Sequence, residues 1–264
     1  MNVLSVKGLC KSYPGFSLQN VSFEIKEGTI MGFVGRNGAG KSTTLKSILN
    51  LVHMDTGSVV FFGLELKAHD REIKQRIGYT GGAVNFYKKK KIKQIVEITK
   101  SFYKKWDDEI CGKYMKLFSL DMEKTPSELS EGMKVKLSLV LALSHGAELL
   151  ILDEPTSGLD PATAEEIQSL IQAEQNNGKT IFLTTHNMAE AEKLCNHVAL
   201  LNEGTIVEYG EPQEICRRYN HQKRLKLHLT DGTDVVLPHN TTVSTELSDY
   251  FAKGLVETIH STEP

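Results

Sequence analysis

The sequence feature that most constrains the fold is a glycine-rich octapeptide, GRNGAGKS, at residues 35–42. It follows the apolar residues 29–34 and precedes a helical pattern that begins at Thr43. This spacing predicts a strand, a loop and a helix, with backbone N–H groups of the loop surrounding phosphate groups at the helix N-terminus. Lys41 would then neutralise phosphate charge, and the Ser42 hydroxyl would bind Mg²⁺. A plain glycine-rich cap is the alternative, and the strand–loop–helix context disfavours it.

Two further apolar segments, residues 149–152 and 180–183, are each followed by a polar turn and a helical pattern. Short apolar runs without alternation are typical of strands buried on both faces of a parallel sheet, whose ends bind ligands. The first segment ends in Asp153 and Glu154. Asp153 there can hold Mg²⁺ through water, and Glu154 can polarise an attacking water. Alone, the two acids are equally consistent with a solvated strand end.

The segment 180–183 leads into His186 and Asn187. His186 would lie at the sheet edge, where it can reach a γ-phosphate, although a lone histidine there is more often structural. Asn187 and Glu190 have the spacing of a helix-capping pair.

Three polar or aromatic loop positions have both a structural and a functional interpretation. Ser130 is expected to cap the helix over residues 133–143, and together with Gly132 it also makes an anion site. Asp160, followed by Pro161, is expected to cap the next helix. Tyr13 precedes Pro14-Gly15, and it either stacks on a base or packs locally.

The remaining segments predict the domain organisation. Residues 4–6 and 21–25 alternate between apolar and polar, as in a half-exposed antiparallel layer. Residues 84–145 predict a helical subdomain inserted into the sheet domain. Beyond residue 218, a hairpin is expected over residues 224–237, with a type I′ turn at Asp231-Gly232. We therefore expect a domain at 1–218 and a small β-containing appendage at 219–264.

Composition excludes several classes of protein. The chain has 31 Lys plus Arg and 33 Asp plus Glu, a net charge of −2, which argues against a broad nucleic-acid surface. Its apolar runs fall short of the ~20 residues of a membrane helix, and no signal segment opens the chain. Its four cysteines lack C-x-x-C spacing, so we expect buried thiols in a reducing cytosol rather than a zinc site.

Taken in order, these motifs resemble the ATP-binding cassette (ABC) ATPases over roughly residues 2–218. The resemblance implies an α/β fold: a P-loop NTPase core with an antiparallel β layer, an inserted helical subdomain at about 84–145 and the C-terminal appendage. It also implies ATP hydrolysis with Mg²⁺ in a head-to-tail dimer, a homodimer or a heterodimer with a second ATP-binding subunit. Family members usually finish with a further helix, so we expect the chain to be truncated at Pro264.

The resemblance also assigns site residues. Tyr13 would stack on adenine, Glu154 would be the catalytic base, and His186 would contact the γ-phosphate. Ser130 and Gly132 would contact the partner's nucleotide, and Asp160 would lie at the dimer seam. Mg²⁺ would be held by Ser42 and Asp153, and the phosphates by Gly35, Arg36, Asn37, Gly38, Ala39, Gly40, Lys41, Ser42 and Thr43.

Two departures from the family pattern bear on function. The signature at residues 129–133 is LSEGM, which looks like subunits of bacterial exporters for peptides, antibiotics or lipids. Gly82 stands where the family has Gln or Glu, which removes one water and Mg²⁺ contact that Asn85 is a candidate to replace.

We therefore expect the energy-supplying subunit of a membrane exporter, working with a separate transmembrane permease and no nucleic acid. It would be cytoplasmic, peripheral at the inner face of the cell membrane. A nucleic-acid or ribosome-directed ABC ATPase usually has two cassettes or a long coiled coil, and a P-loop kinase has no use for Ser130 and His186.

Overall fold

The computed structural model describes residues 1–81, 87–219, 224–238 and 243–262. The chain separates into two compact units, Met1–Glu211 and Pro212–Pro264, each with its own contacts. The boundary expected after residue 218 lies later in the chain than this division, inside helix α8 (Pro212–Tyr219). Gly82 and Asn85, whose expected effects concern Mg²⁺ and the attacking water, lie outside the described residues.

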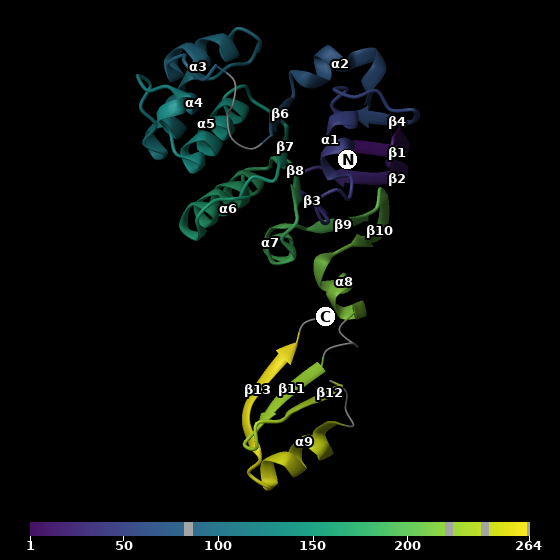
Figure 1. Ribbon diagram of the computed structural model, residues 1–264. Coiled ribbons are helices and arrows are strands. Elements are labelled where there is room, and N and C mark those ends of the chain that lie inside the picture. The colour runs from purple at the N-terminus through teal and green to yellow at the C-terminus, as the bar shows by residue number, and fades with distance from the viewer. Residues whose placement is uncertain (82–86, 220–223, 239–242, 263–264) are drawn as a thin grey trace. The chain divides into compact units, whose positions relative to one another are not determined.

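The first unit contains two sheets (Figure 1). The antiparallel sheet has the strand order β2-β1-β4-β5. The six-stranded sheet has the order β10-β9-β3-β8-β7-β6, with an antiparallel edge at β10 and parallel pairing elsewhere. The strands are β1 Asn2–Tyr13, β2 Phe16–Lys26, β3 Ile30–Val34, β4 Thr56–Phe61, β5 Leu64–Glu65, β6 Ile77–Thr80, β7 Leu149–Asp153, β8 Thr180–Thr185, β9 His197–Asn202 and β10 Thr205–Gly210.

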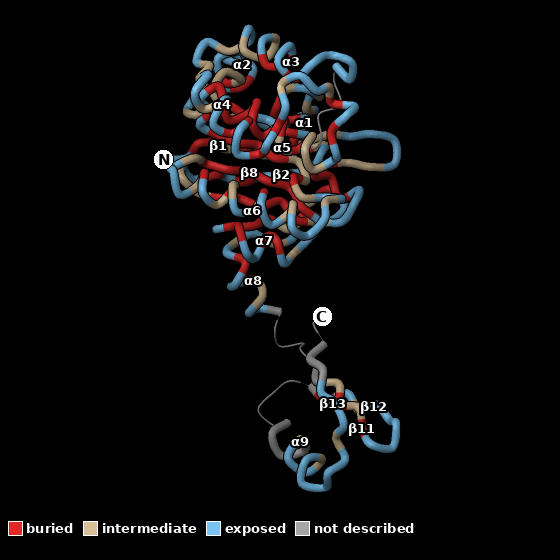
Figure 2. Tube along the Cα trace, turned by 90° about the vertical axis from the view of Figure 1, so that its left-hand side faces the viewer, coloured by how far each residue is buried: buried red, intermediate tan, exposed pale blue. Residues whose placement is uncertain are grey.

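The apolar runs predicted as buried strands are confirmed. Every residue of β3 and of β8 is buried, as are the first four of β7. The core of this unit includes three aromatic rings, Phe23, Phe33 and Phe182, whose centroids lie 4.7 to 5.4 Å apart. Figure 2 shows the buried residues concentrated along the strands. Because β3, β7 and β8 are parallel, their carboxyl ends lie at one edge of the sheet, where the predicted site residues follow.

Helices of the first unit follow the predicted periodicity. Figure 1 shows α3, α4 and α5 grouped beside the β6 end of the six-stranded sheet, within the residues expected to form a helical subdomain. The contact between α5 and β6 is close, because a Cβ at Gly78 would come within 2.6 Å of the Ala142 carbonyl oxygen. The helices are α1 Lys41–Ile48, α2 Leu66–Lys74, α3 Ile92–Lys100, α4 Asp108–Leu117, the 3₁₀ turn Pro126–Glu128, α5 Glu131–Leu143, α6 Pro161–Asn176 and α7 Met188–Leu194.

The second unit contains α8, a three-stranded antiparallel sheet and one further helix, α9 (Val243–Ala252). The sheet has the order β12-β11-β13, from β11 Arg224–Leu229, β12 Asp234–Pro238 and β13 Val256–Thr262. Its small core is built on Leu227, Leu229 and Leu237.

The hairpin prediction is right, but its type I′ turn is wrong. A type I′ turn needs positive φ at both central residues. Only Gly232 has positive φ (82°), and its N–H bonds the Leu229 carbonyl 2.9 Å away. The Asp231 carboxylate instead accepts from the Thr233 N–H, which favours a longer loop with glycine after the turn.

Candidate functional site

The glycine-rich loop after β3 is shaped by two close approaches. Gly40 has a φ of 110°, and a Cβ there would lie 2.6 Å from the Leu18 side chain. A Cβ at Gly35 would lie 2.4 Å from the Leu201 carbonyl oxygen. Both positions therefore exclude a side chain. Helix α1 begins directly after Gly40, so the loop backbone and the free N–H groups of the first turn point to the same region.

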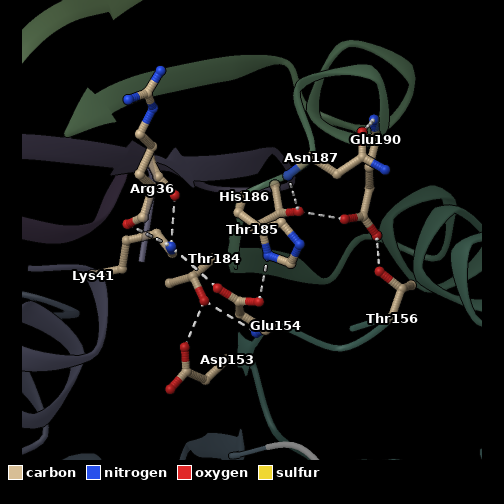
Figure 3. A network of polar contacts seen from close by, with 11 residues as sticks. Arg36, Lys41, Asp153, Glu154, Thr156, Thr184, Thr185, His186, Asn187 and Glu190 are labelled. Carbon is tan, nitrogen blue, oxygen red and sulfur yellow. Dashed lines mark hydrogen bonds and ion pairs between the residues drawn. The ribbon is translucent and has the colours of Figure 1, made fainter. Parts of the chain in front are cut away.

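Lys41 is the first residue of α1 and is only 5% exposed. Its Nζ donates to the carbonyl oxygens of Gly35 (2.7 Å) and Arg36 (3.3 Å), and lies 3.1 Å from Glu154 Oε1 (Figure 3). This ammonium is thus anchored on the loop that its own helix follows, and faces the acidic end of β7. Ser42 lies beside it and is exposed, while Thr43 is half-buried.

Asp153 is the last residue of β7 and Glu154 follows it, and the hydroxyl of Thr184 connects them. It donates to Asp153 Oδ1 at 2.6 Å and accepts from the Glu154 N–H at 3.0 Å. Glu154 has a φ of 50°, a left-handed conformation that is uncommon outside glycine and costs energy. The Thr184 hydroxyl and carbonyl oxygens both accept a hydrogen bond from the Glu154 N–H, and these bonds help to hold the strained turn.

The Glu154 carboxylate lies between two donors. Its Oε2 accepts from His186 Nδ1 at 2.7 Å, opposite the Lys41 contact on Oε1. Burial raises the pKa of the Glu154 carboxyl, but the hydrogen bonds from Lys41 and His186 outweigh burial and hold that pKa below its ordinary value. A carboxylate at this point is therefore ionised at neutral pH and able to accept a proton.

His186 begins the turn that leads into α7, and Asn187 caps that helix. The Asn187 side chain accepts from the N–H groups of Ala189 (3.0 Å) and Glu190 (3.3 Å). The expected capping pair is therefore only half right: Glu190 does not return a bond to the Asn187 N–H, because that N–H donates to Thr185 Oγ1 at 3.0 Å. A cavity of about 210 Å³ lies here, lined by residues of the loop after β7, of the end of β8 and the turn that follows it, and of α7.

The N-termini of α5 and α6 lie against each other. Ser130 Oγ accepts from the Met133 N–H (3.3 Å) and Asp160 Oδ1 from the Thr163 N–H (3.0 Å), so both predicted caps are confirmed. Hydrogen bonds from the Thr163 backbone and hydroxyl lower the pKa of Asp160. A Cβ on Gly132 would lie 2.8 Å from Thr163 Cγ2, which places the two capped ends side by side.

The predicted residues thus fall into three groups. Lys41, Asp153, Glu154 and His186 meet at one sheet edge. Ser130, Gly132 and Asp160 gather at the two capped helix ends, and in the described part of the chain no hydrogen bond or ion pair connects them to the first group. Tyr13 is the third group. It ends β1 and is 43% exposed, with Lys11 Nζ 5.5 Å from its ring centre.

Three threonines of the site were not predicted from the sequence: Thr156, Thr184 and Thr185. Their signal was available in part, because Thr184 and Thr185 directly follow the apolar segment 180–183. The paired register of Asp153 with Thr184 shows why they matter. Which hydroxyl serves which carboxylate depends on that register.

The arrangement combines an anion-binding loop, an anchored ammonium and an ionised carboxylate beside an imidazole. Comparison with known proteins bears on which reaction uses it. The model of the ABC transporter family matches residues 18–157, and protein YtrB of Bacillus subtilis, an ABC transporter ATP-binding protein, is 32% identical over 89% of this chain and 79% of its own. The chain belongs to the ABC transporter family.

Other ABC relatives differ in what their names say they transport. The bacitracin transport ATP-binding protein BcrA of Bacillus licheniformis is 33% identical over 84% of this chain and 72% of its own. The methionine import ATP-binding protein MetN of Clostridium acetobutylicum is 31% identical over 89% and 77%. A solved ATP binding subunit of an ABC transporter superposes with a TM-score of 0.75 at 27% identity, over 82% of this chain and 93% of that one.

Membership of the ABC family confirms the predicted fold class and the predicted enzymatic activity. The chain is the ATP-binding, ATP-hydrolysing subunit of a transporter. No helix in the described part of this ABC subunit combines the length and apolar character that crossing a bilayer requires.

Proposed function

We propose that this ABC subunit powers an exporter by closing, with Mg-ATP, into a head-to-tail dimer beneath a separate transmembrane permease. The observation that carries the catalytic part is the Glu154 carboxylate held between Lys41 and His186. The exporter assignment is supported by the LSEGM signature at residues 129–133 and by the similarity to BcrA. The second subunit is another copy of this chain or a different ATP-binding subunit, and the assembly lies at the cytoplasmic face of the membrane.

Different residues of the first unit bind the phosphates, the adenine and the Mg²⁺ of Mg-ATP. The N–H groups of residues 35–43 and the Lys41 ammonium bind the β- and γ-phosphates, and Tyr13 stacks on adenine. The oxygens of Ser42 and Asp153 suit Mg²⁺, which prefers oxygen ligands, and Thr184 occupies only one Asp153 oxygen through its hydroxyl. The metal, when bound with ATP, would neutralise charge on the phosphates.

In the proposed hydrolysis, Glu154 accepts the proton of the attacking water. Its ionised carboxylate takes a proton from water as the water oxygen bonds to the γ-phosphorus and the bond to the β–γ bridging oxygen breaks. His186 holds that carboxylate from one side and faces the γ-phosphate. Ser130 and Gly132 of the second subunit close over the nucleotide, with each Asp160 at the seam.

The proposed composite site is tested by mixing two inactive subunits. Lys41→Ala removes the ammonium from the phosphate loop, and Ser130→Arg blocks the signature helix end. A mixed dimer then has one doubly damaged site and one intact site, whereas each variant alone has none. We expect mixing to restore ATP occlusion in one site per dimer. Absence of restoration, or two functional sites per mixed dimer, would contradict the head-to-tail arrangement.

Transport direction needs a separate measurement. The subunit is co-reconstituted with its permease in vesicles with ATP on the outside only. Substrate accumulation inside the vesicles is the result expected of an exporter. Loss of preloaded substrate instead would assign an importer, as the name of MetN indicates for that relative.

A further inference from the structure

Glu190 on α7 is a nearly fully buried carboxylate, 3% exposed, that the proposed reaction does not use. Its Oε1 accepts from the Thr156 hydroxyl and its Oε2 from the Thr185 hydroxyl, both at 2.6 Å (Figure 3). A charge buried this deeply requires such donors. The carboxylate therefore joins two chain segments that are almost thirty residues apart.

Each threonine belongs to a loop with a predicted functional residue. Thr156 lies between Glu154 and Asp160 in the loop that follows β7. Thr185 is the last residue of β8 and directly precedes His186. Because β7 and β8 are adjacent and parallel, both loops leave the same sheet edge, and Glu190 bridges them there.

We propose that Glu190 is a positioning residue for ATP hydrolysis. Its carboxylate sets the loop from Glu154 to Asp160 at a fixed distance from His186. The position of Asp160 at the dimer seam, which rests on the proposed function, is thereby transmitted to the Glu154–His186 pair. When the second subunit moves Asp160, the loop moves against an anchored point rather than freely.

The direction of the hydrogen bonds decides which substitution breaks them. The Thr185 oxygen already accepts from the Asn187 N–H, so its own hydrogen points to Glu190. The Thr156 hydroxyl also donates to Glu190. A glutamine can accept from Thr185 through its oxygen and donate to Thr156 through its NH₂ group, because a threonine hydroxyl rotates and has acceptor lone pairs. Glu190→Met has a similar unbranched shape and only a weakly accepting sulfur, so it breaks both bonds.

The test measures Glu190→Met in the full chain by steady-state ATPase kinetics, equilibrium binding of Mg-ATP and thermal unfolding. We expect kcat to fall about 10- to 100-fold, because small misplacement of reacting groups has effects of that order. KM and the Kd for Mg-ATP should stay within about twofold, because the phosphate loop is not touched. Glu192→Met, on the exposed side of the same helix, is the matched control and should equal wild type.

A second pair of variants separates positioning from general loss of structure. Thr156→Val should lower kcat as Glu190→Met does, and the double variant should lose no more activity than Glu190→Met alone, because Glu190→Met has already removed the Thr156 bond. Thr156→Ser keeps the hydroxyl and should retain most of kcat. This pair also decides the matter if Glu190→Met does not fold.

Wild-type kcat in Glu190→Met, additive losses in the double variant, or equal losses in Thr156→Ser and Thr156→Val would overturn the proposal. Size-exclusion chromatography of wild type with ATP separates the two ideas. A wild-type chain that never dimerises contradicts the proposed function, whereas a chain that dimerises but tolerates Glu190→Met contradicts only the positioning role.

Discussion

At the residue scale, the Glu154 carboxylate depends on neighbours from two other segments, Lys41 before it in the chain and His186 after it. Its left-handed backbone is held by Thr184, a residue of the adjacent strand. The side chain and the backbone of Glu154 are thus positioned by different partners. A substitution that keeps the size of this side chain should leave its surroundings in place.

Glu154→Gln tests the catalytic base. The amide keeps the shape of the side chain but cannot take a proton, so we expect kcat to fall by about 10²- to 10⁴-fold. Mg-ATP affinity should not decrease, and ATP should hold the dimer closed. Single-turnover hydrolysis and equilibrium binding measure the two effects, with Glu192→Gln as control. Turnover at the wild-type rate would show that another group is the base.

At the scale of elements, α5 is fixed at both ends. Its N-terminus, with Gly132, lies against Thr163 of α6. Its C-terminus is followed by His145, a side chain 1% exposed whose ring nitrogen Nε2 bonds the Ile77 carbonyl of β6 at 3.0 Å. The helix that carries the signature is therefore held to the six-stranded sheet at its far end.

Gly132→Ala tests the contact between α5 and α6. Alanine alone favours a helix over glycine by about 1 kcal/mol, but its methyl group would lie 2.8 Å from Thr163 Cγ2. Threonine is stiff at χ1, so we expect a lower melting temperature in this variant. Thr163→Ser removes the opposing methyl group and should return the double variant to at least the melting temperature of Thr163→Ser alone. A loss of stability that persists in the double variant would exclude this contact as its cause.

His145 predicts how stability depends on pH. Burial, with a smaller contribution from the charge of Lys179, lowers the pKa of His145 from 6.5 to about 4. The unfolded chain takes up a proton near pH 6.5 and the folded chain only near pH 4. The contribution of His145 to the free energy of unfolding is therefore fully present above pH 6.5. It falls as the pH drops toward 4, by up to about 1.4 kcal/mol per pH unit.

His145→Gln keeps an N–H donor for the Ile77 carbonyl and does not titrate. Urea unfolding between pH 7 and pH 4.5 should show a smaller pH dependence in this variant. His53→Gln, an exposed histidine, should behave as wild type. An unchanged slope in His145→Gln would mean that other groups cause the loss at low pH.

At the scale of the whole molecule, every proposed site residue lies in the unit Met1–Glu211. The second unit has its own sheet and its own small core. Nucleotide binding and the fold of the second unit should therefore be separable.

Chains that end at residue 211 and at residue 218 test this independence. We expect both to fold and to bind Mg-ATP with the affinity of the full chain, measured by circular dichroism and calorimetry. The pair also isolates α8, whose Ile215 is 2% exposed. Binding by the chain ending at 218 but not by the shorter one would assign α8 to the ATPase domain, and failure of both would make the appendage part of the core.

The sequence alone determined the features that depend on local spacing. The strand–loop–helix at residues 30–48, the acids at the end of β7, and the caps Ser130 and Asp160 could be predicted because each is encoded within about ten neighbouring residues. The motif order implied the ABC fold, and the comparisons confirmed it. The assigned roles of the site residues, the domain boundaries and the mode of dimerisation stay predictions.

Only the tertiary structure decided which side chains share a hydrogen bond. Lys41, Glu154 and His186 meet because parallel strands bring their ends to one edge, and Thr184 serves Asp153 through strand register. Glu190, expected to cap α7, instead bridges two threonines because Thr185 takes the N–H it would have used. Such partners depend on distance in three dimensions. Spacing along a chain of 264 residues does not measure that distance directly.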